Sequence, residues 1–263
     1  MQRDVAARLV VDVGGSATIA LQIAAAANHE VSQSLIVTID GRATQPRRVQ
    51  ADHGGWIHVV ESGPGELVVQ YSARVVGTGV PLVSGEADLL RYLRPSRYCE
   101  SDSLAPTARA EFAGLAGAAL LAAVSSWVGT QLQYVPGSSL PTDGAVATLL
   151  ARRGVCRDYA HLVVALLRSL DVPARLVAVY APGLDPMDFH AVAEAYVEGA
   201  WHVVDATTLA PRGSLLRIST GRDASDTAFM SAYGGQATLR EVEVLAVADI
   251  LPPDDVHQLT GLV

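Results

Sequence analysis

The stretch Gly154-Val155-Cys156-Arg157-Asp158-Tyr159-Ala160-His161-Leu162 decides the fold of this chain. Apolar residues continue beyond it at helical spacing, at Leu166, Leu167 and Leu170, until Asp171-Val172-Pro173. This spacing predicts a helix that begins near Cys156. Unpaired backbone N–H groups at a helix N-terminus favour a thiolate over a thiol, so the sequence places a cysteine where it ionises readily.

A predicted hairpin downstream carries an imidazole and a carboxylate. Residues alternate from Phe189 to Val197, Glu198-Gly199 is typical of a two-residue turn, and Ala200 to Asp205 forms the returning strand. If Val197 lies opposite Ala200, Asp205 falls on the same face as His190 and diagonal to it, about 7–8 Å away at the backbone. A turn longer by one residue would put the two side chains on opposite faces.

A thiol, an imidazole and a carboxylate in one chain suggest nucleophilic catalysis. A free thiol is mostly protonated near neutral pH, so it needs a base within reach. An imidazole takes its proton, and a carboxylate holds that imidazole in the required tautomer and orientation.

These motifs resemble the transglutaminase-like superfamily, in particular bacterial proteins with a Gly-Val-Cys-Arg-Asp core, a Phe-His-Ala strand and a Trp-x-x-x-Asp strand. Three further segments match the family pattern: Leu93–Tyr98, Arg168–Arg175 and Gly221–Asp226. The resemblance implies that Cys156 is the nucleophile, His190 the general base and acid, and Asp205 the orienting carboxylate. Ala206 departs from the pattern, because many relatives have proline there.

An acyl-transfer cysteine also needs hydrogen-bond donors for the oxyanion. The backbone N–H of Cys156 is the natural first donor. Gln131, Gln133 and Tyr134 are candidates for the second, and Tyr134 is preferred. Arg157 and Asp158 are candidate substrate contacts, although a buried Asp158 that accepts backbone N–H bonds is the favoured interpretation.

The other histidines and the second cysteine are interpreted as non-catalytic. His161 lies about 140° around the helix from Cys156, and His202 alternates away from Asp205. Cys99 is expected to be a thiol without a catalytic role, with a regulatory disulfide to Cys156 as the alternative. The sequence contains no C-x-x-C or H-E-x-x-H pattern, so we expect no metal and no cofactor.

The pattern predicts an α+β protein of two domains. Short alternating apolar segments separated by turns predict an antiparallel β-domain over residues 1–90. Residues 91–263 are expected to form a papain/transglutaminase-like catalytic core, in which the cysteine helix packs on an antiparallel sheet. An alanine-rich segment from Thr107 to Val128 predicts a helix behind the cysteine helix, too short in its apolar part for a membrane span.

Charge and composition exclude some partners. The net charge is −8, and no basic cluster occurs, which argues against nucleic acid and against anionic membranes. No signal sequence is recognisable at the start and the two cysteines are expected to be unpaired, so we expect cytoplasmic residence. The sequence specifies no oligomeric state, and it contains no lysine.

The expected reaction is acyl transfer through a thioester on a peptide or protein substrate. Hydrolysis, as in a cysteine protease or amidase, is favoured. Amine transfer to a protein glutamine, which crosslinks proteins, is the alternative within the same chemistry. A peptide-binding protein without catalysis is the alternative of another class, and the complete set of three catalytic residue types argues against it.

Overall fold

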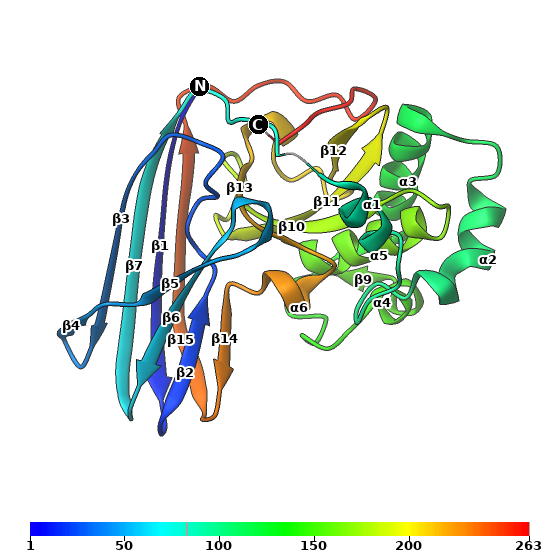
Figure 1. The fold of residues 1–263 in the computed structure, drawn as a ribbon. Coiled ribbons are helices and arrows are strands. Elements are labelled where there is room, and N and C mark those ends of the chain that lie inside the picture. The colour runs from blue at the N-terminus through cyan, green and yellow to red at the C-terminus, as the bar shows by residue number, and fades with distance from the viewer. Residues whose placement is uncertain (83, 263) are drawn as a thin grey trace.

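The computed structural model describes residues 1–82 and 84–262, and it contains a β-sandwich beside a body of helices packed on a sheet (Figure 1). One sheet of the sandwich has the strand order β15-β1-β7-β3-β4 and the other has the order β14-β2-β6-β5. The strands are β1 (Gln2–Val13), β2 (Ala17–Leu21), β3 (Val31–Ile39), β4 (Arg42–Thr44), β5 (Arg47–Gln50), β6 (Trp56–Ser62), β7 (Gly65–Val76), β14 (Met230–Tyr233) and β15 (Ala237–Ala248).

The alternating apolar pattern of the first 90 residues produces this sandwich. In β1 the residues Val5, Ala7 and Leu9 are buried, while the residues between them are only partly covered. They pack against the inward residues of β7, such as Leu67 and Val69, because side chains alternate between the two faces of a strand. The all-β N-terminal part expected from the sequence is thus present.

Two strands of the sandwich come from the far end of the chain. β15 pairs with β1 along its whole length, and β14 pairs with β2. The domain boundary expected at residue 90 would therefore separate β14 and β15 from the strands to which they are hydrogen-bonded. The chain leaves the sandwich once, builds the helical body, and returns to complete both sheets (Figure 1).

The helical body is built around a third antiparallel sheet, with the order β12-β11-β10-β13. Its strands are β10 (Ala174–Tyr180), β11 (Phe189–Val197), β12 (Ala200–Val204) and β13 (Leu216–Gly221). The helices are α1 (Glu86–Arg91), α2 (Ser101–Glu111), α3 (Gly117–Gln131), α4 (Ala145–Ala151), α5 (Cys156–Arg168) and α6 (Ala224–Thr227), and a short parallel pair joins β8 (Gln133–Tyr134) to β9 (Arg153–Gly154).

Helix α5 lies at the centre of this body. Every residue from Asp158 to Arg168 is buried. Its apolar side chains, including Leu162 and Leu166, share one core with residues of α2, α3 and β11. The prediction of an α+β core with the cysteine helix packed on an antiparallel sheet is confirmed.

The helix expected from Thr107 to Val128 is wrong in its bounds, because two helices occupy this region. α2 ends at Glu111 and α3 begins at Gly117. Gly114 and Gly117 have φ angles of 79° and 55°, a backbone region that favours glycine and interrupts a right-handed helix. The buried side of α3 still packs against α5, as expected.

No helix in the described part of the chain is long and apolar enough to cross a membrane.

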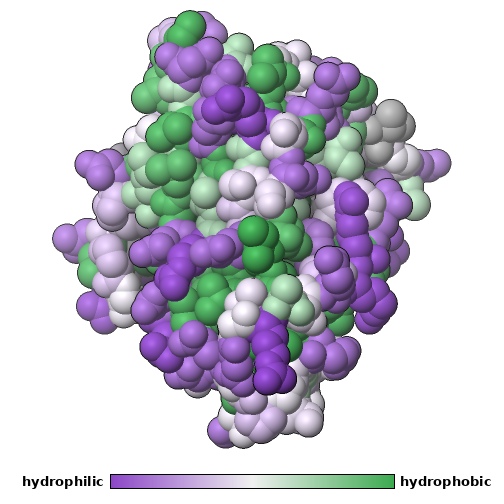
Figure 2. Space-filling view, turned by 90° about the vertical axis from the view of Figure 1, so that its left-hand side faces the viewer, coloured by the Kyte–Doolittle hydropathy of each residue, from purple (hydrophilic) through white to green (hydrophobic). Residues whose placement is uncertain are grey.

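The β-sandwich forms the face of the molecule seen in Figure 2, where apolar side chains alternate with polar ones. Exposed apolar residues on the sandwich strands include Ile36, Val76 and Leu245. Ion pairs such as Arg74–Asp4 and Arg8–Glu241 lie among them.

Candidate active site

Cys156 is the first residue of α5, as the sequence predicts. Val155 before it is extended, and Gly154 belongs to β9. The Asp158 carboxylate accepts the backbone N–H of Val155 at 2.8 Å, which closes the first turn of the helix. A Cβ on residue 154 would come within 2.7 Å of the Asp158 side chain, so this tight entry requires glycine.

The hairpin that carries His190 and Asp205 has the predicted register. Val197 pairs with Ala200, and the two turn residues Glu198 and Gly199 have φ angles of 53° and 83°. Positive φ at both positions is the pattern of a type I′ turn. As a result His190 Nε2 lies 2.8 Å from Asp205 Oδ2, and both side chains are buried.

The Asp205 carboxylate has further hydrogen-bond donors that were not predicted. Its Oδ1 accepts the backbone N–H of Thr207 at 2.9 Å and the Thr207 hydroxyl at 2.7 Å. Burial alone would raise the pKa of Asp205, but His190 and the Thr207 donors outweigh burial and lower it. A hydroxyl residue two positions after an aspartate is a known local bonding pattern, and that spacing was the available signal for Thr207.

His190 is held as a charged partner of Asp205. Burial alone would lower the pKa of His190, but the Asp205 carboxylate and the Cys156 side chain outweigh burial and raise it to about 10. The buried Nδ1 makes no hydrogen bond of good geometry within the described chain. The Cys156 thiol nevertheless lies close enough to contribute to the raised pKa of His190.

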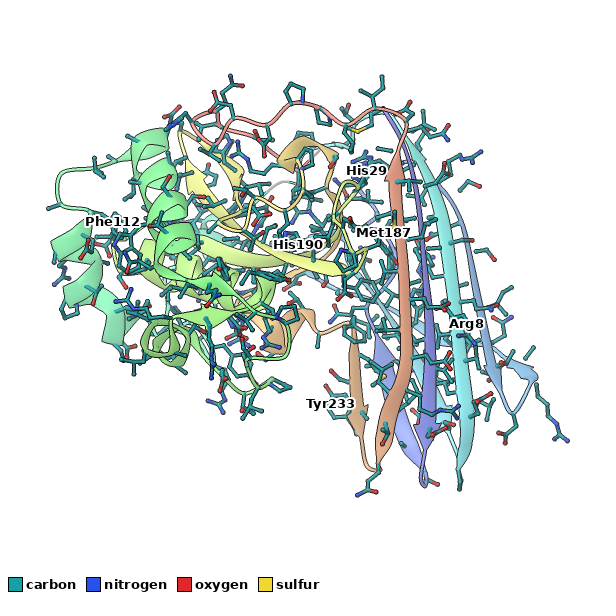
Figure 3. The ribbon with its side chains drawn as sticks, turned by 180° about the vertical axis from the view of Figure 1, so that it is seen from behind. Arg8, His29, Phe112, Met187, His190 and Tyr233 are labelled. Carbon is teal, nitrogen blue, oxygen red and sulfur yellow. The ribbon has the colours of Figure 1, made fainter. Side chains whose placement is uncertain are left out.

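The position of His190 between the two bodies is visible in Figure 3, where it lies between the helices and the β-sandwich. Nε2 is bound to the Asp205 carboxylate, and Nδ1 has no hydrogen bond of good geometry to the described residues. This arrangement allows Nδ1 to hold a proton given up by the thiol while Nε2 stays bound to Asp205.

Tyr134 lies beside Cys156, because β8 pairs with β9 and aligns Tyr134 with Gly154. Burial first, and then the Cys156 side chain, raise the pKa of Tyr134 to about 12, while the Cys156 backbone N–H acts to lower it. A phenol with a raised pKa stays protonated and can donate a hydrogen bond at neutral pH. Of the other two candidates for the second donor, the Gln131 side chain is bound by Arg152, while Gln133 is exposed, as Tyr134 is.

Arg157 and Asp158 bind each other and the preceding loop. The Arg157 guanidinium donates to the Ser139 hydroxyl at 2.9 Å and to Asp158 at the same distance. Asp158 is fully buried and also accepts the Ser139 hydroxyl. The geometry matches the favoured interpretation of Asp158 as a buried acceptor of backbone N–H bonds.

His161 and Cys99 lie in the interior. The His161 Nε2 accepts the backbone N–H of Ala224 at 3.1 Å, and burial lowers its pKa to about 4. Cys99 is fully buried, and burial raises its pKa to about 12. Both Cys99 and Cys156 are free thiols. Within residues 1–82 and 84–262, no group of three or more His, Cys, Asp or Glu side chains is arranged to hold a metal ion.

The fold and this site define a class of thiol-dependent enzymes. The family model of the transglutaminase-like superfamily matches residues 113–206. The solved structure of a proposed cysteine protease from Cytophaga hutchinsonii is 31% identical, with a TM-score of 0.88, and the match covers 98% of this chain and 96% of that one. The chain belongs to the transglutaminase-like superfamily.

Two further similarities are weaker. The uncharacterized protein ML0607 of Mycobacterium leprae is 29% identical over 123 residues, which are 43% of this chain and 44% of that protein. The chain thus matches less than half the length of this curated relative. The periplasmic domain of TgpA from Pseudomonas aeruginosa is 19% identical, with a TM-score of 0.40 and coverage of 75% and 91%, which is too low to support an argument.

Proposed function

We propose that this protein is a thiol-dependent acyl-transfer enzyme in which Cys156 is the nucleophile, His190 the general base and acid, and Asp205 the orienting carboxylate. The observation that carries the proposal is the buried His190–Asp205 bond of 2.8 Å beside the Cys156 thiol at a helix N-terminus. Such an arrangement stabilises the thiolate–imidazolium pair that attacks a carbonyl.

In the first half of the reaction, His190 Nδ1 holds the proton that Cys156 has given up, and the thiolate Sγ attacks the carbonyl carbon of a peptide or amide. The Cys156 backbone N–H and the Tyr134 hydroxyl donate to the oxyanion that forms. His190 then protonates the leaving amine as the carbon–nitrogen bond breaks. The product is a thioester on Cys156.

In the second half, His190 takes a proton from water, and the hydroxide attacks the thioester. The carbon–sulfur bond breaks and the carboxylic acid leaves. The Cys156 thiolate is restored beside His190, which keeps the proton taken from water. We favour hydrolysis because the relative from Cytophaga hutchinsonii, similar over its whole length, is described as a proposed cysteine protease.

Transfer to an amine is the second candidate. The same thioester reacts with a primary amine if the amine reaches it before water. The chain contains no lysine, so an enzyme of this kind would not crosslink itself through lysine side chains. The lack of lysine does not decide whether an amine or water reacts with the thioester. It is compatible with a transferase that modifies other proteins.

The test is mass spectrometry of a glutamine-containing peptide library after incubation with the wild type or with Cys156→Ala, with and without a primary amine. Cleaved or deamidated peptides that are absent with the variant support a hydrolase. Peptides that gain the mass of the amine support a transferase. If the peptides stay unchanged with both proteins, the result contradicts catalysis on glutamine-containing peptides and favours a binding protein.

A further inference from the structure

A second carboxylate stands at the start of the strand that carries His190. Asp188 precedes β11 directly and lies two residues before His190. Side chains two positions apart on an extended chain point to the same side, so Asp188 and His190 emerge on one side of the strand. Asp188 Oδ1 accepts the backbone N–H of Phe189 at 2.7 Å, which fixes the carboxylate at this end of the strand.

Unlike Asp205, Asp188 is exposed to solvent. Within the described chain it forms no salt bridge, and Arg157 of the cysteine helix is bound to Asp158 and Ser139. A carboxyl group of this kind carries its negative charge near neutral pH. It is therefore free to act on a group that approaches from solvent.

Asp188 interacts electrostatically with groups of the proposed site. Partial burial raises the pKa of Asp188, and the charge of His190 opposes this rise. Asp188 in turn contributes to the raised pKa of Tyr134, which also responds to Cys156. Asp188 is thus an exposed charge two residues from His190, and its charge acts on Tyr134.

We infer that Asp188 determines specificity: it selects substrates that carry a positive charge, an ammonium or guanidinium group, next to the acyl group that Cys156 attacks. The inference rests on the proposed role of Cys156 as the nucleophile. A unit charge roughly 7 Å away through water changes a rate about threefold, so a cation and an anion differ about tenfold. Salt weakens such an effect, because both charges are open to solvent.

The experiment measures the local potential at Cys156 without a known substrate. Three methanethiosulfonates are compared, with a trimethylammonium-ethyl, a methyl and a sulfonatoethyl group, which are cationic, neutral and anionic. In each reaction Sγ forms a disulfide with the sulfenyl sulfur, and methanesulfinate leaves with the electron pair of the broken sulfur–sulfur bond. Rates come from intact-protein mass spectrometry and are divided by the rates of N-acetylcysteine amide.

The decisive variant is Asp188→Asn, which keeps an oxygen for the Phe189 N–H and removes only the charge. Asp185→Asn is the matched control, because it removes one charge from the same exposed loop, and Asp185 is not among the groups that act on His190 or Tyr134. We expect the cation-to-anion rate ratio in the wild type and in Asp185→Asn to be about tenfold above that in Asp188→Asn. This difference shrinks at high salt.

An unchanged ratio in Asp188→Asn, or an equal fall in Asp185→Asn, overturns the inference. Failure of the proposed function has a different signature. In that case the neutral reagent reacts with Cys156 no faster than with the free thiol, whatever the charge ratio is. The two failures are thus read from different reagents in the same experiment.

Discussion

His190 Nε2 and Asp205 Oδ2 lie 2.8 Å apart in the protein interior, across a hairpin whose turn has only two residues. This turn fixes which face of the sheet each side chain occupies, since an additional residue would move Asp205 to the other face. The short turn at Glu198-Gly199 therefore positions His190 and Asp205, although neither turn residue belongs to the site.

The first prediction concerns Asp205→Asn. We expect the substitution to keep the hairpin but to lower the pKa of His190, because the neutral amide cannot stabilise an imidazolium. By comparison with other catalytic triads, turnover falls about 10²- to 10⁴-fold. Nitrogen-15 NMR of the imidazole reports the pKa directly, and a titration of His190 that is the same in both proteins would contradict the assigned role of Asp205.

The second prediction concerns stability and pH. The pKa of His190 is raised from 6.5 to about 10 in the folded state, so the folded protein keeps a proton that the unfolded chain has lost. The stabilisation is fully present below pH 6.5 and is lost as the pH rises toward about 10. The free energy of unfolding, measured with denaturant, should decline over this window.

The control for this decline removes both partners, as in His190→Ala with Asp205→Ala, because removing one would leave a buried charge unpaired. If the double variant loses stability with pH as steeply as the wild type, the ion pair is not the cause.

The third prediction concerns Tyr134→Phe. The ring remains and only the hydroxyl is lost, so substrate binding changes little while kcat falls about 10²- to 10³-fold, as for loss of an oxyanion donor. Tyr159→Phe is the matched control, since Tyr159 packs against Tyr134 with ring centroids 5.9 Å apart. Unchanged turnover in Tyr134→Phe would remove the phenol from the mechanism.

The fourth prediction concerns Thr207→Val, which removes one hydroxyl donor from Asp205 and keeps the shape of the side chain. Loss of a hydrogen bond to a buried carboxylate costs about 1–3 kcal/mol of stability. We expect a lower melting temperature and a less acidic Asp205. Thr208→Val, at an exposed neighbour, should change neither property.

The geometry of the β11–β12 hairpin was predictable because its determinants are local. Strand alternation and a Glu-Gly turn set the relation of His190 to Asp205 without information from the rest of the chain. The start of α5 at Cys156 was predictable for the same reason, since its apolar spacing and the glycine before it lie within a few residues.

The remaining features depend on distant contacts or on weak signals. The pairing of β15 with β1 joins segments more than 200 residues apart, and an alternating pattern does not reveal its partner. The break between α2 and α3 depends on glycines that a helical pattern also tolerates. Thr207 was missed because one hydroxyl after an aspartate is common, and only the fold shows that the aspartate is buried.

The proposed nucleophile is tested by the rate at which iodoacetamide alkylates Cys156 near pH 6, with the buried Cys99 as the internal reference. We expect Cys156 to react much faster than Cys99 in the wild type and to lose this advantage in His190→Gln, because the imidazole no longer stabilises the thiolate. Equal, slow rates for the two cysteines in the wild type would show that Cys156 is not an activated nucleophile.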